Sequence, residues 1–236
     1  LSPGNRRGTF PGGSLGWRVS QENFFKNSSV AKVWTDFKLR GSYAQVGNVD
    51  IGNYPYAGTY LPYLYGAQAA IGYSQFGNAL LRYETSKKED YGIDLGFFDG
   101  RITVSADYYR NLVDGLILGV QTPPSDGVPL NQYNANVGTL YNKGFELVVT
   151  TQNINRQDFS WSTSLNFSTN VNKVTALDAN NTPLYPTYLG GSYTVTKVGE
   201  SISSLYGYDY QGVNPANGNP LYKKIDGTIV QGDINT

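Results

Sequence analysis

The segment LRYETSKKEDYGIDLGFFDGRITVSADYYRNLVDGLIL, residues 81–118, decides the fold. It holds two runs in which apolar or aromatic residues alternate with charged or small ones, and Asp99-Gly100 separates the runs. Successive side chains of a strand point to opposite faces, so the alternation predicts two strands with one apolar face each. Asp-Gly favours a hairpin turn because glycine tolerates positive φ. Each arm has about 15 residues or more, against about 5–6 in an ordinary strand, so the segment predicts an unusually long hairpin.

Similar alternation occurs on both sides of this hairpin. In the stretch FSWSTSLNFSTNVNKV, residues 159–174, serines and asparagines occupy nearly every second position. A water-filled lumen accepts such a polar ladder, whereas a dry core would leave its hydroxyl and amide groups without partners. Long strands with an apolar outside and a polar inside are typical of a membrane β-barrel. The expected strands cover residues 9–19, 32–46, 81–98, 101–118, 140–153 and 158–175.

The connections between these strands alternate between short and long. Turns are expected near residues 26, 99 and 155, with one helical turn capped by Ser20 in the first of them. Long loops without regular structure are expected at 46–80 and 119–140. Weaker strand character remains at 193–198 and 204–210. Bacterial barrels have short periplasmic turns and long extracellular loops, so the turns are assigned to the periplasm.

Composition excludes several function classes. Eighteen acidic and 18 basic residues balance, which gives no sign of a nucleic-acid partner. Cys and His are absent, so thiol chemistry and the commonest metal ligand are missing, and no cofactor or metal is expected. No apolar run is long enough for a membrane helix. Without a signal peptide or an initiating Met, the chain is expected to be an internal or proteolysed piece of a longer protein.

The strand pattern assigns candidate site residues to two solvents. One face is expected to line the lumen and the other to contact lipid. Carboxylates on the lumen side could serve as a general acid and base on a glycan, but an ionic lattice on a barrel wall is the expected role, so no enzyme is predicted. The lumen-facing candidates are Glu84, Asp94, Arg101, Asp107, Glu146 and Asn166, and the lipid-facing candidates are Ile93, Leu95, Ile102, Val104, Leu147 and Leu165.

Tyrosine is concentrated in the long segment 46–80. Its flat ring and hydroxyl suit sugar faces and peptide side chains, so these residues are candidates for ligand or partner contact. Packing within the loop and anchoring at the membrane interface are the alternatives. The candidates are Tyr54, Tyr56, Tyr60, Tyr63 and Tyr65. Further along, Asp226-Gly227 and Asp233 have a spacing similar to a calcium loop, but a plain turn is expected because the closing Glu is absent.

Six stretches resemble, in order, the SusC/RagA-type TonB-dependent transporters of the Bacteroidetes outer membrane. They are FPGGSLGWRVSQENFF (10–25), DFKLRGSYAQVGN (36–48), LRYETSKKEDYGIDLGFFDGRITVSADYYRNLVDGLI (81–117), NVGTLYNKGFELVVTTQNI (136–154), FSWSTSLNFSTNVNKV (159–174) and VGESISSLYGYDYQGV (198–213). Tyr83-Glu84 stands where the family often has Trp-Glu. Nothing in the chain resembles the plug domain, the TonB-contacting box or the final strand of the family.

The resemblance implies an all-β fold: a partial transmembrane antiparallel barrel, about six long strands of about 22. Residues 1–236 would be a segment of one barrel domain in the outer membrane. It further implies nutrient uptake of oligosaccharides or oligopeptides, energised by TonB through a region absent here, with a SusD-like surface lipoprotein as partner. The alternatives are a passive or secretion-associated barrel, or a soluble β-sandwich adhesin or carbohydrate-binding module.

Overall fold

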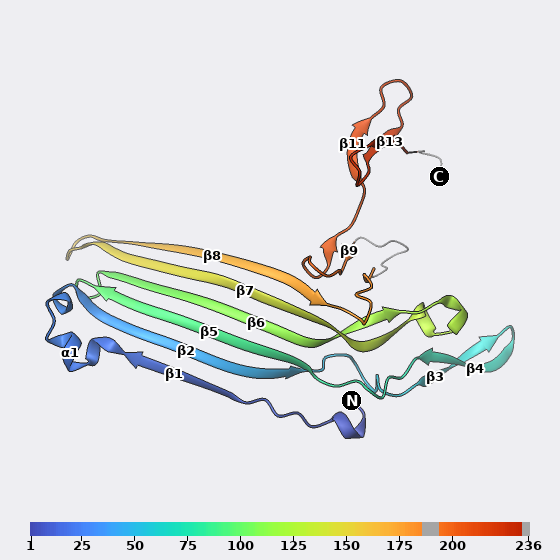
Figure 1. Ribbon diagram of the computed structural model, residues 1–236, viewed down its shortest axis with the longest axis horizontal. Helices are drawn as coiled ribbons and strands as arrows, with labels where there is room; N and C mark the ends of the chain where they lie inside the picture. The colour runs from blue at the N-terminus through green and yellow to red at the C-terminus, as the bar shows by residue number, and fades with distance from the viewer. Residues whose placement is uncertain (186–193, 233–236) are drawn as a thin grey trace.

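A computed structural model describes residues 1–185 and 194–232, and its main element is one antiparallel sheet of six strands (Figure 1). Neighbours in the sheet follow the order β1-β2-β5-β6-β7-β8. No helix in these ranges is long and apolar enough to cross a membrane. The six strands are β1 (Gly12–Arg18), β2 (Trp34–Asn48), β5 (Glu84–Phe97), β6 (Ile102–Gln121), β7 (Gln132–Asn155) and β8 (Ser160–Ala176).

The hairpin of β5 and β6 turns where the sequence predicts. Phe98, Asp99 and Gly100 have φ values of 53°, 56° and 81°. The amide of Arg101 donates to the carbonyl of Phe98 at 3.2 Å and closes the turn. Thirteen successive pairs, from Thr85 with Asp114 to Phe97 with Ile102, then form without a break in register. The prediction of a long hairpin is confirmed.

The other two connections at this end differ in length. Arg156 donates to the Phe159 carbonyl at 2.9 Å and closes a tight turn between β7 and β8, so β7 runs two residues beyond the expected 153. Between β1 and β2 the chain forms η2 (Val19–Gln21), α1 (Asn23–Lys26) and η3 (Ser29–Lys32). The predicted helix cap is wrong. Ser20 is buried and its hydroxyl donates to Asp36 at 2.9 Å, and Glu22 occupies the N-cap position of α1.

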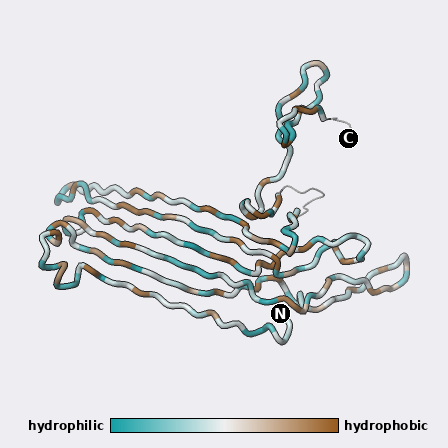
Figure 2. Tube along the Cα trace, in the orientation of Figure 1, coloured by the Kyte–Doolittle hydropathy of each residue, from teal (hydrophilic) through white to brown (hydrophobic). Residues whose placement is uncertain are grey.

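Each strand of the sheet presents one apolar and one polar face. Register places Leu95, Val104 and Leu165 in line on one face, connected through Val149. Polar residues occupy the intervening positions, and Figure 2 shows the resulting change of hydropathy along every long strand. Side chains that pair across antiparallel strands lie on the same face, so the two faces are continuous from β2 to β8.

The sheet is a single open layer. In residues 1–185 and 194–232, no second sheet covers either face (Figure 1). These residues therefore do not form a β-sandwich, because a sandwich buries the inner faces of two sheets against each other. The outer edge of β1 pairs with no described strand, and that of β8 is covered only near Val174, by the backbone of Gly199 and Glu200. Unpaired strand edges of this kind are available for pairing with further strands.

Two segments expected to be loops are partly strand. Within 46–80, β3 (Thr59–Tyr65) pairs with β4 (Gln68–Gln75) in a separate hairpin that extends beyond the sheet (Figure 1). Within 119–140, β6 continues to Gln121 and β7 begins at Gln132, so the connection is short. Sequence periodicity misses β3 and β4 because hydrophobic and aromatic residues occupy both faces of their hairpin.

The segment after β8 returns to the polar face of the sheet. Leu177 and Leu184 pack on Leu140 and Val174, which continue that face at its outer end, and Val113 packs against the cluster. Beyond this lie β9 (Thr194–Val195) with β10 (Ser204–Leu205), and the small sheet β11 (Asp209–Val213), β12 (Pro220–Lys223) and β13 (Ile229–Gln231). β9, β10 and the start of β11 agree with the weaker strand character predicted at 193–198 and 204–210, whereas β12 and β13 were not predicted. Tyr193 and Asp233 lie outside the described residues.

Candidate functional site

A charged network joins three strands on the polar face. The Arg40 guanidinium on β2 donates to both carboxylate oxygens of Asp94 on β5, with Nε–Oδ2 2.8 Å and Nη2–Oδ1 3.0 Å. The same Nη2 lies 2.9 Å from Oδ1 of Asp107 on β6 and donates to its Oδ2 at 3.1 Å. Ser105 donates to Asp94 at 2.9 Å. A bidentate arginine is among the strongest polar contacts, so this network fixes β2, β5 and β6 relative to one another.

Gly92 makes the reach of Arg40 possible. It lies between Arg40 and Asp107 in the register, and a Cβ built on it would come 2.3 Å from Asp107 Oδ1 and 2.7 Å from Arg40 Cζ. A side chain at this position would displace the guanidinium. Gly144 serves Tyr109 in the same way, since the Tyr109 hydroxyl crosses β7 above it and donates to Asn170 on β8 at 3.0 Å.

The polar face changes character from β2 to β8. Charged residues concentrate on β2, β5 and β6, and Glu146 on β7 lies next to Asp107 in the register. On β8 the same face carries only serine and asparagine from Ser160 to Asn172. Asn166 lies opposite Val148 within this ladder. Asp94, Asp107, Glu146 and Asn166 thus share one face, as the alternation predicts.

Two of the six residues assigned to the lumen lie at the ends of the sheet. Arg101 precedes β6 in the turn, and its guanidinium donates to the Asn153 carbonyl at 3.2 Å, away from the charged network. Glu84 begins β5 on the polar face, and its Oε1 accepts from the amide of Ile117 at 2.8 Å. This contact holds β6 just after a bulge at Gly115, whose φ is 67°. The Asp-Gly pair at 114–115 is the sequence signal that could have predicted the bulge.

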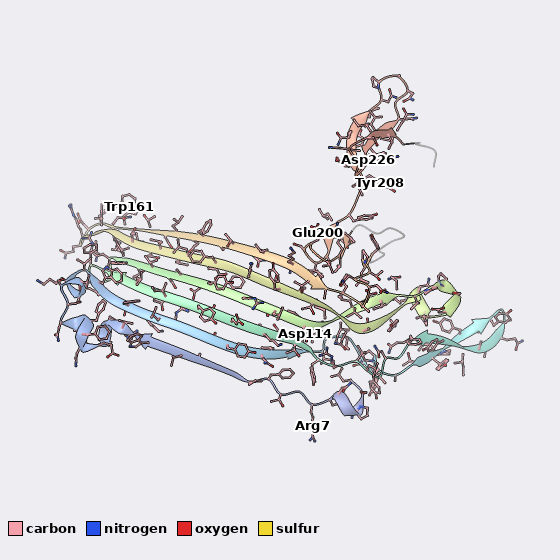
Figure 3. All side chains as sticks on the ribbon, in the orientation of Figure 1. Arg7, Asp114, Trp161, Glu200, Tyr208 and Asp226 are labelled. Carbon is pink, nitrogen blue, oxygen red and sulfur yellow. The ribbon has the colours of Figure 1, made fainter. Side chains whose placement is uncertain are left out.

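The six residues assigned to lipid share the opposite face. Ile93 and Leu147 lie in one row through Ala106, and Leu95, Val104 and Leu165 lie in the next. Ile102 pairs with Phe97 at the turn end. Aromatic residues bound this surface near the turns, where the rings of Trp34 and Phe97 are 5.3 Å apart and Trp161 lies on β8 (Figure 3).

The hairpin of β3 and β4 separates the five tyrosine candidates. Tyr63 and Tyr65 lie on one face of it, with the Tyr63 ring over Gly72. Tyr60 lies on the other face and stacks with Tyr73, with ring centroids 5.0 Å apart. Tyr54 and Tyr56 precede the hairpin and contact each other. Sequence reasoning missed Tyr73 and Phe76, which connect the hairpin to Tyr133 on β7.

The hairpin and its flanks carry no charge. No Asp, Glu, Lys or Arg occurs from residue 51 to residue 81, and most of the apolar side chains of β3 and β4 are exposed. Tyr65 at the tip is 84% exposed. Large exposed apolar surfaces of this kind commonly mark contact with a ligand or a partner.

Asp226 forms a turn contact with Thr228. Its Oδ1 accepts from the Thr228 hydroxyl at 2.6 Å and from the Thr228 amide at 2.9 Å, and these bonds lower the pKa of the carboxyl. In residues 1–185 and 194–232, no three acidic side chains gather in a group that could hold a metal ion.

Sequence comparison agrees with this arrangement of strands. Residues 2–232 match the TonB-dependent receptor-like β-barrel family. The chain belongs to this family. Its members are outer-membrane transport proteins, so the long strands are those of an outer-membrane barrel. The expected fold class, family and location are therefore confirmed.

Several relatives of known name are similar to the chain. TonB-dependent receptor P3 of Formosa agariphila is 35% identical over 90% of this chain and 22% of its own length. TonB-dependent receptor SusC of Bacteroides thetaiotaomicron is 33% identical over 99% of this chain and 25% of its own length. The chain thus spans about a quarter or less of these proteins. Two solved structures share its fold. The RagAB peptide transporter has a TM-score of 0.82 and 24% sequence identity, and the match covers 98% of this chain and 25% of that chain. The RagAB peptide importer in the open-open state has a TM-score of 0.82 and 22% identity, and the match covers 99% of this chain and 25% of that chain.

Proposed function

We propose that the chain forms part of the wall of a TonB-dependent importer that takes up oligosaccharides or oligopeptides through the outer membrane. The observation that carries the proposal is the family membership together with a single-layer sheet that has one apolar and one polar face. One relative is the TonB-dependent receptor SusC, and solved structures with a similar fold are those of the RagAB peptide transporter. A plug moved by TonB and a SusD-like lipoprotein would come from parts of the assembly other than this chain.

In this proposal the apolar face contacts lipid and the polar face lines the lumen. The height of the apolar surface supports the assignment. On β8, Trp161 and Val171 bound the apolar run and are ten positions apart, about 33 Å along a strand with a rise of about 3.3 Å per residue. At a tilt of about 40° the run spans about 25 Å of height, the usual height of the apolar band of a membrane barrel.

The polar face suits a hydrated passage. The network around Arg40 lies on the charged half of this face, and the Ser/Asn ladder of β8 forms an uncharged half. Side chains of both kinds are half-exposed or exposed in this chain, and lumen water would supply the hydrogen bonds that neighbouring residues do not. We assign both halves the role of lumen lining rather than catalysis.

The uncharged hairpin of β3 and β4 lies at the extracellular end and is proposed to contact the substrate or the lipoprotein partner. Tyr63 and Tyr65 would contribute most, because they are exposed on the same face near its tip. Exposed tyrosines offer apolar area and a hydroxyl at little conformational cost.

The test of import uses the complete gene in its own bacterium. A strain without the gene should lose uptake of one member of a panel of defined oligosaccharides and mixed oligopeptides, followed by depletion from the medium. The full-length gene should restore uptake, and a copy without its TonB-contacting box should not. Uptake that does not depend on this box would contradict energised import and favour a passive channel.

A second test concerns the hairpin. Replacing Tyr63 and Tyr65 with Ala should weaken capture of the imported substrate or of the lipoprotein by about thirtyfold, since truncating an interface residue that carries binding energy, a class enriched in Tyr, costs about 1 kcal/mol or more for each residue. Tyr91→Ala with Tyr108→Ala is the matched control, because this pair lies on the apolar face of the sheet and far from the hairpin. Equal losses in both double variants would contradict a contact role for the hairpin.

A further inference from the structure

The apolar face of the sheet ends abruptly toward the long loops. Tyr91, Tyr108 and Phe145 lie side by side in one row of the register across β5, β6 and β7. In the next row outward the aligned residues are Glu89, Arg110 and Lys143. Aromatic rings prefer the level of the lipid headgroups, and Val171, the outer end of the apolar run on β8, pairs with Lys143, so these two rows lie together at the membrane boundary.

Cations dominate the surface beyond this boundary. The row after Arg110 and Lys143 contains Lys87 on β5 and Lys173 on β8, in line through Leu112 and Tyr141. We call Lys87, Arg110, Lys143 and Lys173 the outer cation patch. At about 4.8 Å between strands and about 3.3 Å per residue, it covers about 14 Å by 7 Å of the sheet.

Few anions oppose this patch in the described part of the chain. Glu89 is the one carboxylate in its two rows, and it lies 3.9 Å from Arg110. No other ion pair of the described residues involves the three lysines, and Lys143 and Lys173 are exposed. Asp114 lies one row further toward the loops, where Thr139 donates to it at 3.3 Å. The patch therefore has an excess of positive charge at the headgroup level.

We propose that the outer cation patch binds phosphate groups of the lipid headgroups in the outer leaflet. The inference rests on the proposed lipid contact of the apolar face. Charge complementarity carries it: four cations lie where the headgroups of a bacterial outer leaflet, which is rich in phosphorylated lipopolysaccharide, would surround the barrel. Basic clusters beside the membrane surface bind phosphorylated headgroups.

The test compares two triple variants of the full-length protein in detergent. Lys87→Gln, Lys143→Gln and Lys173→Gln remove charge from the patch. The control combines Lys88→Gln with Lys223→Gln and Lys224→Gln. Lys88 is the neighbour of Lys87 on the opposite face, and the other two lie at and just after the end of β12, outside the six-stranded sheet. The affinity for purified lipopolysaccharide should fall at least about tenfold in the patch variant and stay unchanged in the control.

Two ligand arms identify what is bound. Lipopolysaccharide stripped of its phosphates should bind the unaltered protein at least about tenfold more weakly, and high salt should reduce binding of the native form. The proposal is overturned if the patch variant binds native lipopolysaccharide normally, if dephosphorylated lipid binds equally well, or if inorganic phosphate alone binds as tightly. Lys143→Gln alone, compared with Lys88→Gln, replaces the triple variants if they do not assemble.

This outcome is separable from the proposed function. If the patch variant imports normally and binds lipopolysaccharide as tightly as the unaltered protein, the lipid-binding role of the patch is rejected and the proposed import function still stands. If an arginine in the middle of the apolar face were harmless, the lipid contact itself would be wrong, and the proposed orientation of the wall would be rejected.

Discussion

An arginine placed on either side of β8 tests which face meets lipid. Leu165 lies four residues from Trp161, about 10 Å above it at a tilt of about 40°, and so near the middle of a band about 25 Å high. Leu165→Arg should therefore cost about 2–4 kcal/mol, because an arginine at the bilayer midplane loses its hydration. In a folding equilibrium this cost is a factor of about 30 to several hundred.

Asn166 is the matched control because it is the next residue and points to the other face, opposite Val148. Asn166→Arg should change stability by less than about 0.5 kcal/mol, since its side chain would meet lumen water and the nearby Glu146. The assay is urea unfolding of the full-length protein in lipid vesicles, followed by tryptophan fluorescence. Equal costs at the two positions, or a larger cost at 166, would refute the facing assignment.

Further predictions concern the polar face and the small sheet. Arg40→Ala should destabilise the barrel by about 1–2 kcal/mol in the same assay, because Asp94 and Asp107 then repel each other; adding Asp94→Asn should recover part of the loss, and no recovery would argue against the network. Gly92→Val should cost about 1–3 kcal/mol by displacing the guanidinium, with Gly13→Val on the exposed β1 as the control near zero. The hydrogen bonds from Thr228 lower the pKa of Asp226, so the turn that they stabilise is fully formed above the ordinary pKa and is lost as pH falls through the lowered value. The backbone amide signal of residue 228 in isotope-labelled protein should follow this titration. Thr228→Val removes the hydroxyl donor and should move the midpoint of the titration to higher pH.

The regular parts of the sheet were predictable from sequence because their residues alternate between two environments. The hairpin turn at Asp99-Gly100 and the separation of Ile93 from Asp94 follow directly from a period of two. The hairpin of β3 and β4 was not predictable in this way. Both of its faces are apolar and aromatic, and such a segment carries no period that distinguishes strand from loop.

The sequence predicted which residues share the polar face, but not which of them contact one another. Asp94 and Asp107 were assigned to one face from alternation, yet their common partner Arg40 lies more than fifty residues earlier in the chain. Arg101 was assigned from the same alternation and lies in the turn instead, because a period of two says nothing about where a strand begins. Ser20 was expected to cap a helix, and its burial beside Asp36 depends on how β2 packs.

By itself, the sequence determined that the chain forms long two-faced strands with a tight turn at Asp99-Gly100, because alternation and turn residues act over a few neighbouring positions. Only the tertiary structure decided which residues meet across strands. The order β1-β2-β5-β6-β7-β8 and its register bring Arg40 across Gly92 to Asp107 and align Lys87, Arg110, Lys143 and Lys173 beyond the aromatic row. Both arrangements depend on pairings between segments far apart in sequence, which no local pattern encodes.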